Sequence, residues 1–398
     1  MRRMAIVALT TTALTAGLLV AAAPVASAKP AATAAIPEPD QDAFYQPAPG
    51  YETKQPGAVL KKRSVTVTGL GIPLPVKAFQ LQSRSTDAKN RPITVVSTVI
   101  VPLTPYFGQR PLLSYQPATD SLGDQCNPSY GLRTGLEKEI PLLALGLAKG
   151  WAVVVTDYQG PRDAYGAGRL EGHAVLDGVR ATLASPESGV TARSPIGLWG
   201  YSGGGLATGW AAELQPSYAP ELKIAGVASG GTPADLAAAG RQMDGGPFSG
   251  LFLAAAIGVS REYPELLAIF NAQGKQLIQE MDDLCVVEEA LYAFRTVKQY
   301  SDLPDPLAAP VAQQVLRINK MGDNAPKAPV YLYHSKFDEL IPWAAGKALN
   351  DSWCAKGTKV SFYTDYASEH NILAVTGAPA AVAFLSARFL GLPAPSTC

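Results

Sequence analysis

The chain has 398 residues, of which 47% are hydrophobic and 17% are charged, so it can bury a large core and disorder over most of its length is excluded. Lys plus Arg and Asp plus Glu number 33 each, for a formal net charge of zero, and this balance gives no indication of a nucleic-acid partner. The length suits one large domain with an insertion, or two ordinary domains.

The first 28 residues have the pattern of a secretory signal peptide. Met1–Arg3 is a short positive segment, residues 5–23 carry no charge, and Ala26–Ala28 matches an A-x-A cleavage site. An uncleaved membrane anchor is the alternative. We expect residues 1–28 to be removed and the protein to be extracellular. No later stretch approaches 18 uninterrupted apolar residues, so we expect no transmembrane segment in the mature chain.

A leader rich in Ala and Pro, residues 29–56, is expected to wrap the surface or fray. Beyond it, runs of β-branched and apolar residues predict strands. These are Ser64–Val67, Ile93–Val101, Pro111–Tyr115, Trp151–Thr156, Ile196–Trp199, Ile224–Ala228, Val330–Tyr333 and Val360–Tyr363. Helical patterns lie between them, at Pro141–Lys149, His173–Ser185, Leu206–Leu214 and Pro379–Leu390. The alternation indicates an α/β fold with a mostly parallel central sheet.

Residues 236–318 interrupt the alternation. They are almost wholly helical in pattern, including Leu251–Ile257 and Glu280–Thr296, and contain no convincing strand. We interpret them as a helical cap inserted between a first core part, 57–235, and a second, 319–398. A pair of surface helices without a role in substrate access is the alternative. The insertion leaves a strand at its C-terminal end, where open α/β sheets bind ligands, and this favours a cap.

The motif Gly200-Tyr201-Ser202-Gly203-Gly204 matches G-x-S-x-G. It follows a predicted strand and precedes a predicted helix, the setting in which a sharp turn exposes a serine nucleophile. Side chains at Gly200 and Gly204 would obstruct the close backbone approach of such a turn. We therefore predict that Ser202 is the nucleophile, although a glycine-rich turn with an idle serine has the same letters.

A serine nucleophile needs a base, and the chain has three histidines. His370 lies in a loop after the last strand, which fits the order Ser, acid, His of α/β-hydrolases. His173 comes before the serine, and His334 lies within a strand. We predict that His370 is the base and that the other two are structural.

The acid is expected between Ser202 and His370, just after a strand. Asp338 has this position, in a turn that leads to Ile341-Pro342. It would hold the imidazole tautomer and stabilise the imidazolium. Glu339 and Asp365 are the competitors, but Asp365 lies too close to His370 in sequence and Glu339 is expected to point away.

Two donors are expected to form an oxyanion hole. Gly203 supplies a backbone N–H at the start of a helix, where the positive end of the dipole favours an anion. The second donor is predicted to be Asp157, in the loop after the strand Trp151–Thr156, through its N–H or a protonated carboxyl. Ordinary surface capping is the alternative for Asp157.

Four cysteines follow the predicted cleavage site, and an exported chain meets an oxidising environment. Three connectivities are possible. We expect Cys354 to pair with Cys398, which ties down the C-terminal tail, and Cys126 to pair with Cys285, which links the early sheet to the cap. No C-x-x-C pair exists, so a zinc ribbon or a thiol redox site is not indicated.

The cap is expected to supply the acyl site. Its stretch Pro247–Leu253 is apolar and is flanked by Gly245, Gly246 and Gly250, which are possible hinges. An acyl chain needs a dry concave surface, and Phe248 and Phe252 are the candidates to line it. Packing of the cap onto the core is the alternative role for each.

Taken together, these segments resemble the secretory lipases that include the fungal lipase A type. The resemblance rests on Phe44-Tyr45, Thr156–Gly160, Leu176–Ala181, Gly200–Gly205 and the loops of Asp338 and His370. It implies an α/β-hydrolase fold, a helical cap over 236–318, an oxyanion hole of Asp157 and Gly203, and hydrolysis of acylglycerols or other carboxylic esters without a cofactor or metal.

The function predicted from the sequence is therefore that of a secreted esterase or lipase, acting on small-molecule or lipid esters through an acyl-enzyme. Transient contact with a lipid interface and a monomeric state are expected. A serine peptidase of the same fold is one alternative, although no acidic anchor for a substrate amine is evident. A catalytically inactive binding protein is the other, and the complete set of Ser202, Asp338 and His370 argues against it.

Overall fold

The computed structural model describes residues 36–398. The predicted signal peptide, 1–28, and the first part of the leader lie outside the described residues. The described chain contains a sheet in the order β1-β4-β5-β7-β6-β8-β9-β10-β11. Its strands are β1 (Val59–Ser64), β4 (Val76–Thr86), β5 (Pro92–Pro102), β6 (Leu112–Gln116), β7 (Ala152–Thr156), β8 (Ile196–Tyr201), β9 (Ile224–Gly230), β10 (Val330–Ser335) and β11 (Val360–Asp365). A separate small hairpin pairs β2 (Thr68–Gly69) with β3 (Ile72–Pro73).

The sheet is parallel from β7 through β6 to β11 and antiparallel among β1, β4, β5 and β7. Every residue of β6, β7, β8 and β10 is buried, as expected of parallel strands that are covered on both faces. The carboxyl ends of the parallel strands meet at one edge, which is where such sheets carry their ligand sites. The expected α/β-hydrolase fold, with its mostly parallel central sheet, is confirmed.

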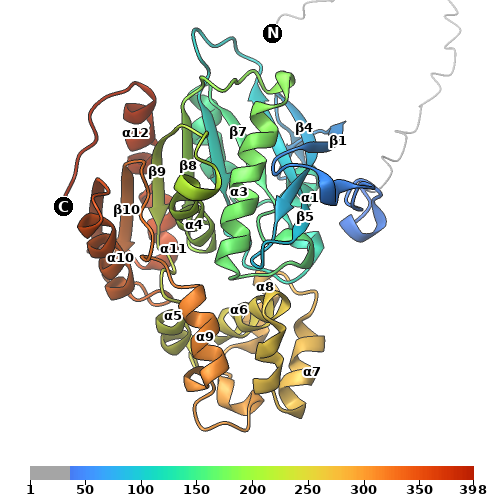
Figure 1. Ribbon diagram of the computed structural model, residues 1–398, viewed down its shortest axis with the longest axis vertical. Coiled ribbons are helices and arrows are strands. Elements are labelled where there is room, and N and C mark those ends of the chain that lie inside the picture. The colour runs from blue at the N-terminus through green and yellow to red at the C-terminus, as the bar shows by residue number, and fades with distance from the viewer. Residues whose placement is uncertain (1–35) are drawn as a thin grey trace, which may run out of the picture. The chain divides into compact units, whose positions relative to one another are not determined.

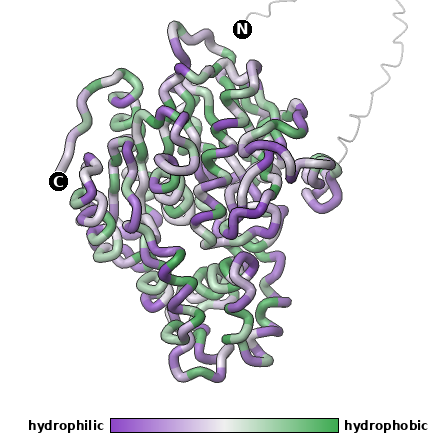
Figure 2. Tube along the Cα trace, in the orientation of Figure 1, coloured by the Kyte–Doolittle hydropathy of each residue, from purple (hydrophilic) through white to green (hydrophobic). Residues whose placement is uncertain are grey.

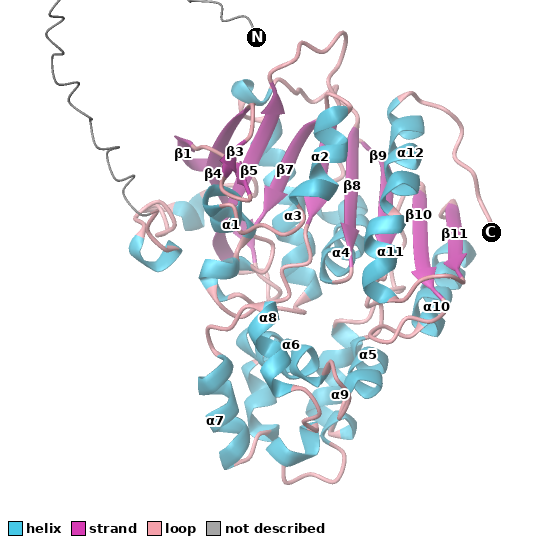
Figure 3. Ribbon diagram, turned by 180° about the vertical axis from the view of Figure 1, so that it is seen from behind, coloured by secondary structure: helices cyan, strands magenta, loops and turns pink. Residues whose placement is uncertain are grey.

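Helices cover both faces of the sheet (Figure 1). One apolar core lies under α3 (Gly168–Leu183), α4 (Gly203–Tyr218) and α10 (Trp343–Ala355). The other lies under α1 (Pro128–Thr134), α2 (Ile140–Ala148), α11 (His370–Thr376) and α12 (Ala378–Phe389). Figure 3 shows α2, α11 and α12 in front of the strands. Figure 2 shows hydrophobic (green) and hydrophilic (purple) segments interspersed along the chain in the orientation of Figure 1.

The insertion between β9 and β10 consists of helices joined by turns, with an isolated β-bridge between Phe270 and Ser301, and lies at the site edge of the sheet (Figures 1 and 3). Its α-helices are α5 (Leu236–Met243), α6 (Ser249–Glu262), α7 (Ala272–Met281), α8 (Val286–Glu289) and α9 (Pro310–Ile318). The helix expected over 280–296 is not continuous: α7 ends at Met281 and α8 is a short turn. Leu122 donates its N–H to the Leu284 carbonyl, and the disulfide at Cys285 fixes the chain at the same place.

Two other predictions differ from the structure. The run Ser64–Val67 lies mostly after β1, which ends at Ser64, and β4 was missed. β4 is buried but polar, with Gln80, Gln82 and Ser83 all inaccessible to solvent. Strands of that composition are not recognised by apolar runs, because their burial depends on polar partners elsewhere in the chain.

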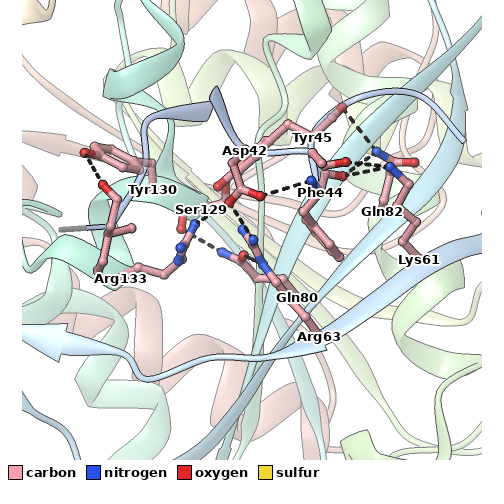
Figure 4. A network of polar contacts seen from close by, with 12 residues as sticks. Asp42, Phe44, Tyr45, Lys61, Arg63, Gln80, Gln82, Ser129, Tyr130 and Arg133 are labelled. Atoms are coloured by element: carbon pink, nitrogen blue, oxygen red, sulfur yellow. Dashed lines mark hydrogen bonds and ion pairs between the residues drawn. The ribbon is translucent and has the colours of Figure 1, made fainter. Parts of the chain in front are cut away.

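Those partners are in the leader. The amide of Gln82 donates to the backbone carbonyls of Phe44, Tyr45 and Gln46, and Asp42 accepts hydrogen bonds from Arg63 and Arg133 (Figure 4). Buried polar groups need such partners. The described part of the leader is therefore held against the sheet by β1, β4 and α1.

Two disulfides are present, Cys126–Cys285 and Cys354–Cys398, and this is the pairing expected from the sequence. The first joins the chain after β6 to the helical insertion. The second closes the C-terminal tail onto α10. By chain entropy each contributes roughly 3–5 kcal/mol to stability.

Within residues 36–398, no single helix has the length and apolarity needed to cross a membrane. Only when taken together are α11 and α12 long and apolar enough for a span, and the two helices are bent by 44° relative to each other.

Candidate active site

The nucleophile candidate Ser202 occupies the turn between β8 and α4. Its φ of 55° and ψ of −124° place a non-glycine residue in a strained conformation, as at the nucleophile elbow of α/β-hydrolases. A Cβ atom at Gly200 would overlap the carbonyl of Gly204, and one at Gly204 would overlap the carbonyl of Gln116. Both glycines are therefore required by close backbone contacts.

Ser202, His370 and Asp338 form one hydrogen-bonded chain. Nε2 of His370 lies 2.8 Å from Oγ of Ser202, and Nδ1 lies 2.7 Å from Oδ2 of Asp338. The other oxygen, Oδ1, accepts from the backbone N–H groups of Leu340 and Ile341 at 3.0 and 2.7 Å. The three residues come from the ends of β8, β10 and β11, which the parallel sheet brings to one edge.

The carboxylate of Asp338 is held in its charged form. Burial opposes ionisation, but hydrogen bonds from His334 and His370 outweigh it and keep the pKa of Asp338 well below its usual value. A charged Asp338 can orient the imidazole of His370 and stabilise the imidazolium.

His173 lies apart from this chain of residues. Its ring packs against Tyr218, and Nδ1 lies 3.3 Å from the carbonyl of Asp87. Burial lowers the pKa of His173 to about 4, so the ring is neutral at pH 7. This is the environment of a packed structural histidine.

Glu339 and Asp365, the alternative candidates for the acid, hold the loop of His370 through hydrogen bonds. Oε2 of Glu339 accepts the N–H of His370 at 3.1 Å, and Asp365 accepts the N–H of Ser368 at 2.6 Å. The hydroxyl of Tyr201 donates to the carbonyl of His370 at 2.7 Å. These contacts fix the backbone from which the imidazole projects.

The structure contradicts the predicted role of Asp157. Its N–H donates to the carbonyl of Val96 at 2.9 Å, and its carboxylate accepts from the N–H and the hydroxyl of Ser129 at 2.8 and 2.6 Å. Burial raises the pKa of Asp157 to about 7, but a proton there does not face the nucleophile. The prediction that Asp157 is an oxyanion donor is therefore wrong.

Asp120, and not Asp157, lies beside the nucleophile. It follows β6 with a φ of 47° and lines the same cavity as Ser202 and His370. A Cβ added to Gly203 would overlap its Oδ1, which is buried and has no hydrogen-bond partner among the described residues. Burial raises the pKa of Asp120 to about 6.

Three donors therefore converge beside Ser202. The N–H of Gly203 opens α4 and has no intrahelical partner. Within residues 36–398, no acceptor takes the N–H of Asp120, and the Asp120 carboxyl is a third donor only when it is protonated, below a pH of about 6. The position of Asp120 in the chain, between β6 and α1, was the signal available in the sequence. α/β-hydrolases take the second oxyanion donor from a loop that joins an early strand to the following helix.

A cavity of about 280 Å³ extends from Ser202 into the helical insertion. Its polar end holds Asp120, Ser202 and His370, and the rest of its wall is mainly apolar. Apolar side chains from the insertion include Met243, Leu251, Phe252, Val259, Leu266, Phe270, Val297, Val315 and Leu316. Phe252 is among the lining residues. Phe248 is not: it packs beside the cavity against the cluster of Met243 and Phe252.

Within the described chain, no three His, Cys, Asp or Glu side chains are grouped so as to hold a metal ion. The chemistry that this arrangement supports is nucleophilic attack by a serine, with a histidine as general base and a carboxylate as its partner.

Fold and site together place the protein among the α/β-hydrolases with a serine nucleophile elbow. Residues 128–397 match the model of the secretory lipase family. The chain belongs to this family.

Several known proteins are similar to the chain. A probable inactive lipase of Mycobacterium tuberculosis is 38% identical over 371 residues, which cover 89% of this chain and 83% of the relative. A secreted triacylglycerol lipase of Malassezia globosa is 34% identical, covering 90% and 83%. The closed-state structure of Candida antarctica lipase A aligns with a TM-score of 0.84 at 30% identity, covering 92% of this chain and 91% of that one.

Proposed function

We propose that this protein is an extracellular carboxylic ester hydrolase that cleaves esters of apolar acyl chains, such as triacylglycerols, through an acyl-enzyme on Ser202. The observation that carries the proposal is the unbroken hydrogen-bonded chain from Asp338 through His370 to Ser202, at the wall of an apolar cavity. The secretory family and the name of the Malassezia relative support the location and the class of substrate.

In acylation, Oγ of Ser202 attacks the ester carbonyl carbon while Nε2 of His370 takes the hydroxyl proton. Negative charge develops on the carbonyl oxygen, beside the N–H of Gly203 and the Asp120 group. Donors preorganised at that point stabilise the transition state more than the ground state. Collapse of the tetrahedral intermediate expels the alcohol, which receives the proton from His370.

In deacylation, His370 takes a proton from water, which attacks the acyl carbonyl, and the same oxyanion site is used again. The proton then returns to Oγ of Ser202 and the fatty acid leaves. Asp338 stays ionised throughout and stabilises the imidazolium in both steps.

The helical insertion is proposed to act as the cap over the acyl chain. Its apolar side chains form most of the cavity wall. A dry wall favours the acyl chain over water and strengthens the electrostatic contacts at the polar end. We also propose that the protein acts as a monomer, which light scattering would test.

The relative from Mycobacterium tuberculosis is named as a probable inactive lipase, so activity needs a direct test. A fluorophosphonate should label wild-type protein but not Ser202→Ala. p-Nitrophenyl esters should be hydrolysed in strong preference to aminoacyl anilides. A folded wild-type protein that is not labelled would show a binding protein, and preference for the anilides would show a peptidase.

A further inference from the structure

The loop that carries Asp120 is held in place by residues of the next loop along the sheet edge. Asp120 is a non-glycine residue at positive φ, a conformation that persists only where its surroundings enforce it. The enforcing contacts come from residues 157–163, the segment that follows β7. None of these residues touches Ser202 or His370 among the contacts of the described chain.

Tyr158 makes the contacts nearest to Asp120. Its hydroxyl donates to the carbonyl of Pro117 at 2.6 Å and accepts the N–H of Thr119 at 3.1 Å. Thr119 is the residue directly before Asp120. Tyr158 is 1% exposed, and burial raises its pKa well above the usual value for tyrosine. The hydroxyl therefore keeps the proton with which it donates.

Two further contacts hold the other end of the same loop. The carboxylate of Asp157 accepts the N–H and the hydroxyl of Ser129, as part of a network that reaches Tyr45 of the leader (Figure 4). Asp163 accepts the side-chain amide of Asn127 at 2.7 Å. The loop from β6 to α1 is thus fixed on both sides of Asp120.

From these contacts we infer that Tyr158 is a positioning residue for the oxyanion site, acting through the backbone of residues 117–119 on Asp120. The inference rests on the proposed function. It assigns a role to the segment Thr156–Gly160 that differs from the donor role expected from the sequence. Asp157 and Tyr158 hold the donor in place instead of donating to the oxyanion themselves.

Tyr158→Phe tests the inference, because it keeps the buried ring and removes both hydrogen bonds. We expect kcat on p-nitrophenyl butyrate to fall by about 10- to 100-fold with KM nearly unchanged, since loss of one oxyanion donor lowers kcat by about 10²–10³. Tyr218→Phe is the matched control. Its hydroxyl also makes two hydrogen bonds, to Thr86 and Asp177, so stability should fall while kcat stays within about twofold.

A double-mutant cycle separates positioning from general loosening of the fold. In an Asp120→Ala background, which keeps the backbone N–H of residue 120, Tyr158→Phe should lower kcat by a clearly smaller factor than in wild type, because the side-chain donor that it positions is already gone. Additive losses would overturn the inference, and so would an unchanged kcat in the single variant. If Tyr158→Phe does not fold, Ser129→Ala removes the hydrogen bonds of the Ser129 hydroxyl with Asp157 and Tyr45 at the start of α1 and should also lower kcat.

Measurements on the wild-type protein distinguish a failure of the inference about Tyr158 from a failure of the proposed function. Turnover by wild type together with an unaffected Tyr158→Phe would overturn the inference alone. Absence of both turnover and fluorophosphonate labelling in folded wild type would overturn the proposed function and the inference with it.

Discussion

Nε2 of His334 lies 3.2 Å from Oδ2 of Asp338, the same carboxylate oxygen that accepts the hydrogen bond from His370. Nε2 of His334 also lies 3.0 Å from the carbonyl of Ile341. Both neighbours are acceptors, so this nitrogen carries the hydrogen and His334 is a donor to the acid. It is buried completely.

This contact predicts a change in pH dependence when His334 is replaced by Leu. Asp338 would lose one donor and attract the proton on His370 more strongly. The acid limb of the pH profile of kcat/KM should then move to higher pH, because a carboxylate with fewer hydrogen-bond donors stabilises the imidazolium more strongly. His334→Gln retains a donor and should shift less. Lower stability without a shifted profile would leave His334 a packing residue only.

Ser202→Ala and His370→Ala should each reduce ester hydrolysis by more than about a thousandfold, and the double variant should be little worse, because the two residues act as a unit. The folded state should survive both changes, which circular dichroism and thermal melts would check. His173→Ala is the control: its ring is packed far from the nucleophile, so stability should fall more than rate. Residual activity of Ser202→Ala above about a thousandth of wild type would contradict the assignment.

The side chains of the proposed active site could be predicted because they follow a rule of topology. Ser202, Asp338 and His370 each come just after a strand, and the parallel sheet brings those ends to one edge. Asp120 satisfies the same rule, yet the sequence pattern favours Asp157. Both residues follow buried strands, but the position of Asp120 after β6 indicates the donor loop. Its direction in that loop depends on contacts such as the hydrogen bond from the N–H of Thr119 to the hydroxyl of Tyr158.

The elements missed from the sequence have a related cause. β4 buries Gln80 and Gln82 because the leader and neighbouring strands supply hydrogen-bond partners, and no local pattern reveals this. The helix expected over 280–296 breaks where Cys285 is joined to Cys126. In each case a partner distant in sequence overrides the local preference.

Asp120 predicts a second pH dependence. Its pKa of about 6 means that the carboxyl is mostly protonated below that pH and mostly charged above it. A protonated carboxyl can donate to the oxyanion, whereas a carboxylate repels it. This group should therefore lower wild-type kcat as pH rises past about 6. Asp120→Asn keeps a neutral donor and should remove that decline.

Asp120→Leu completes the test, because it removes the side-chain donor and keeps the backbone N–H. Below pH 6 its kcat should be about 10²-fold lower than that of wild type, and the difference should shrink at higher pH, where the wild-type carboxyl has lost its proton. If Asp120→Leu had wild-type activity, the backbone N–H groups of residues 120 and 203 alone would form the oxyanion hole. Steady-state kinetics from pH 4.5 to 9 would distinguish these cases.

Glu289 predicts that the fold is less stable at alkaline pH. It lies in the helical insertion, is buried completely, and neither carboxyl oxygen has a partner among the described residues. Burial raises the pKa of Glu289 to about 9. Below the unfolded value of about 4.3 both states are protonated. Between that pH and 9 only the unfolded state releases its proton, so stability falls as pH rises.

The matched variants are Glu289→Gln and Glu52→Gln, the latter at an exposed position. At pH 8, Glu289→Gln should melt at a higher temperature than wild type, and the gain should shrink towards pH 4.5. Each unit of raised pKa corresponds to about 1.4 kcal/mol, so a gain of up to a few kcal/mol is expected. Glu52→Gln should show no such pH-dependent gain. Equal melting curves for wild type and Glu289→Gln at both pH values would contradict the prediction.

The two phenylalanines proposed for acyl binding predict different outcomes, because only one of them lines the cavity. Phe252 is 6% exposed and contributes to the wall, while Phe248 packs beside it. Phe252→Ala enlarges the apolar site, so kcat/KM for p-nitrophenyl esters of long acyl chains should rise relative to the butyrate. A change of about tenfold in that ratio is expected, since a methylene-sized difference in an apolar pocket contributes about 1–3 kcal/mol.

Phe248→Ala is the matched control for this change. It removes the same group from the same helical insertion, so it should lower stability and leave the chain-length ratio within about twofold of wild type. Esters with two, four, eight and sixteen acyl carbons would provide the comparison. An equal loss for all four esters in Phe252→Ala would show that Phe252 only packs the insertion. An altered ratio in Phe248→Ala with an unaltered one in Phe252→Ala would place the acyl chain on the other side of the cluster that the two rings share.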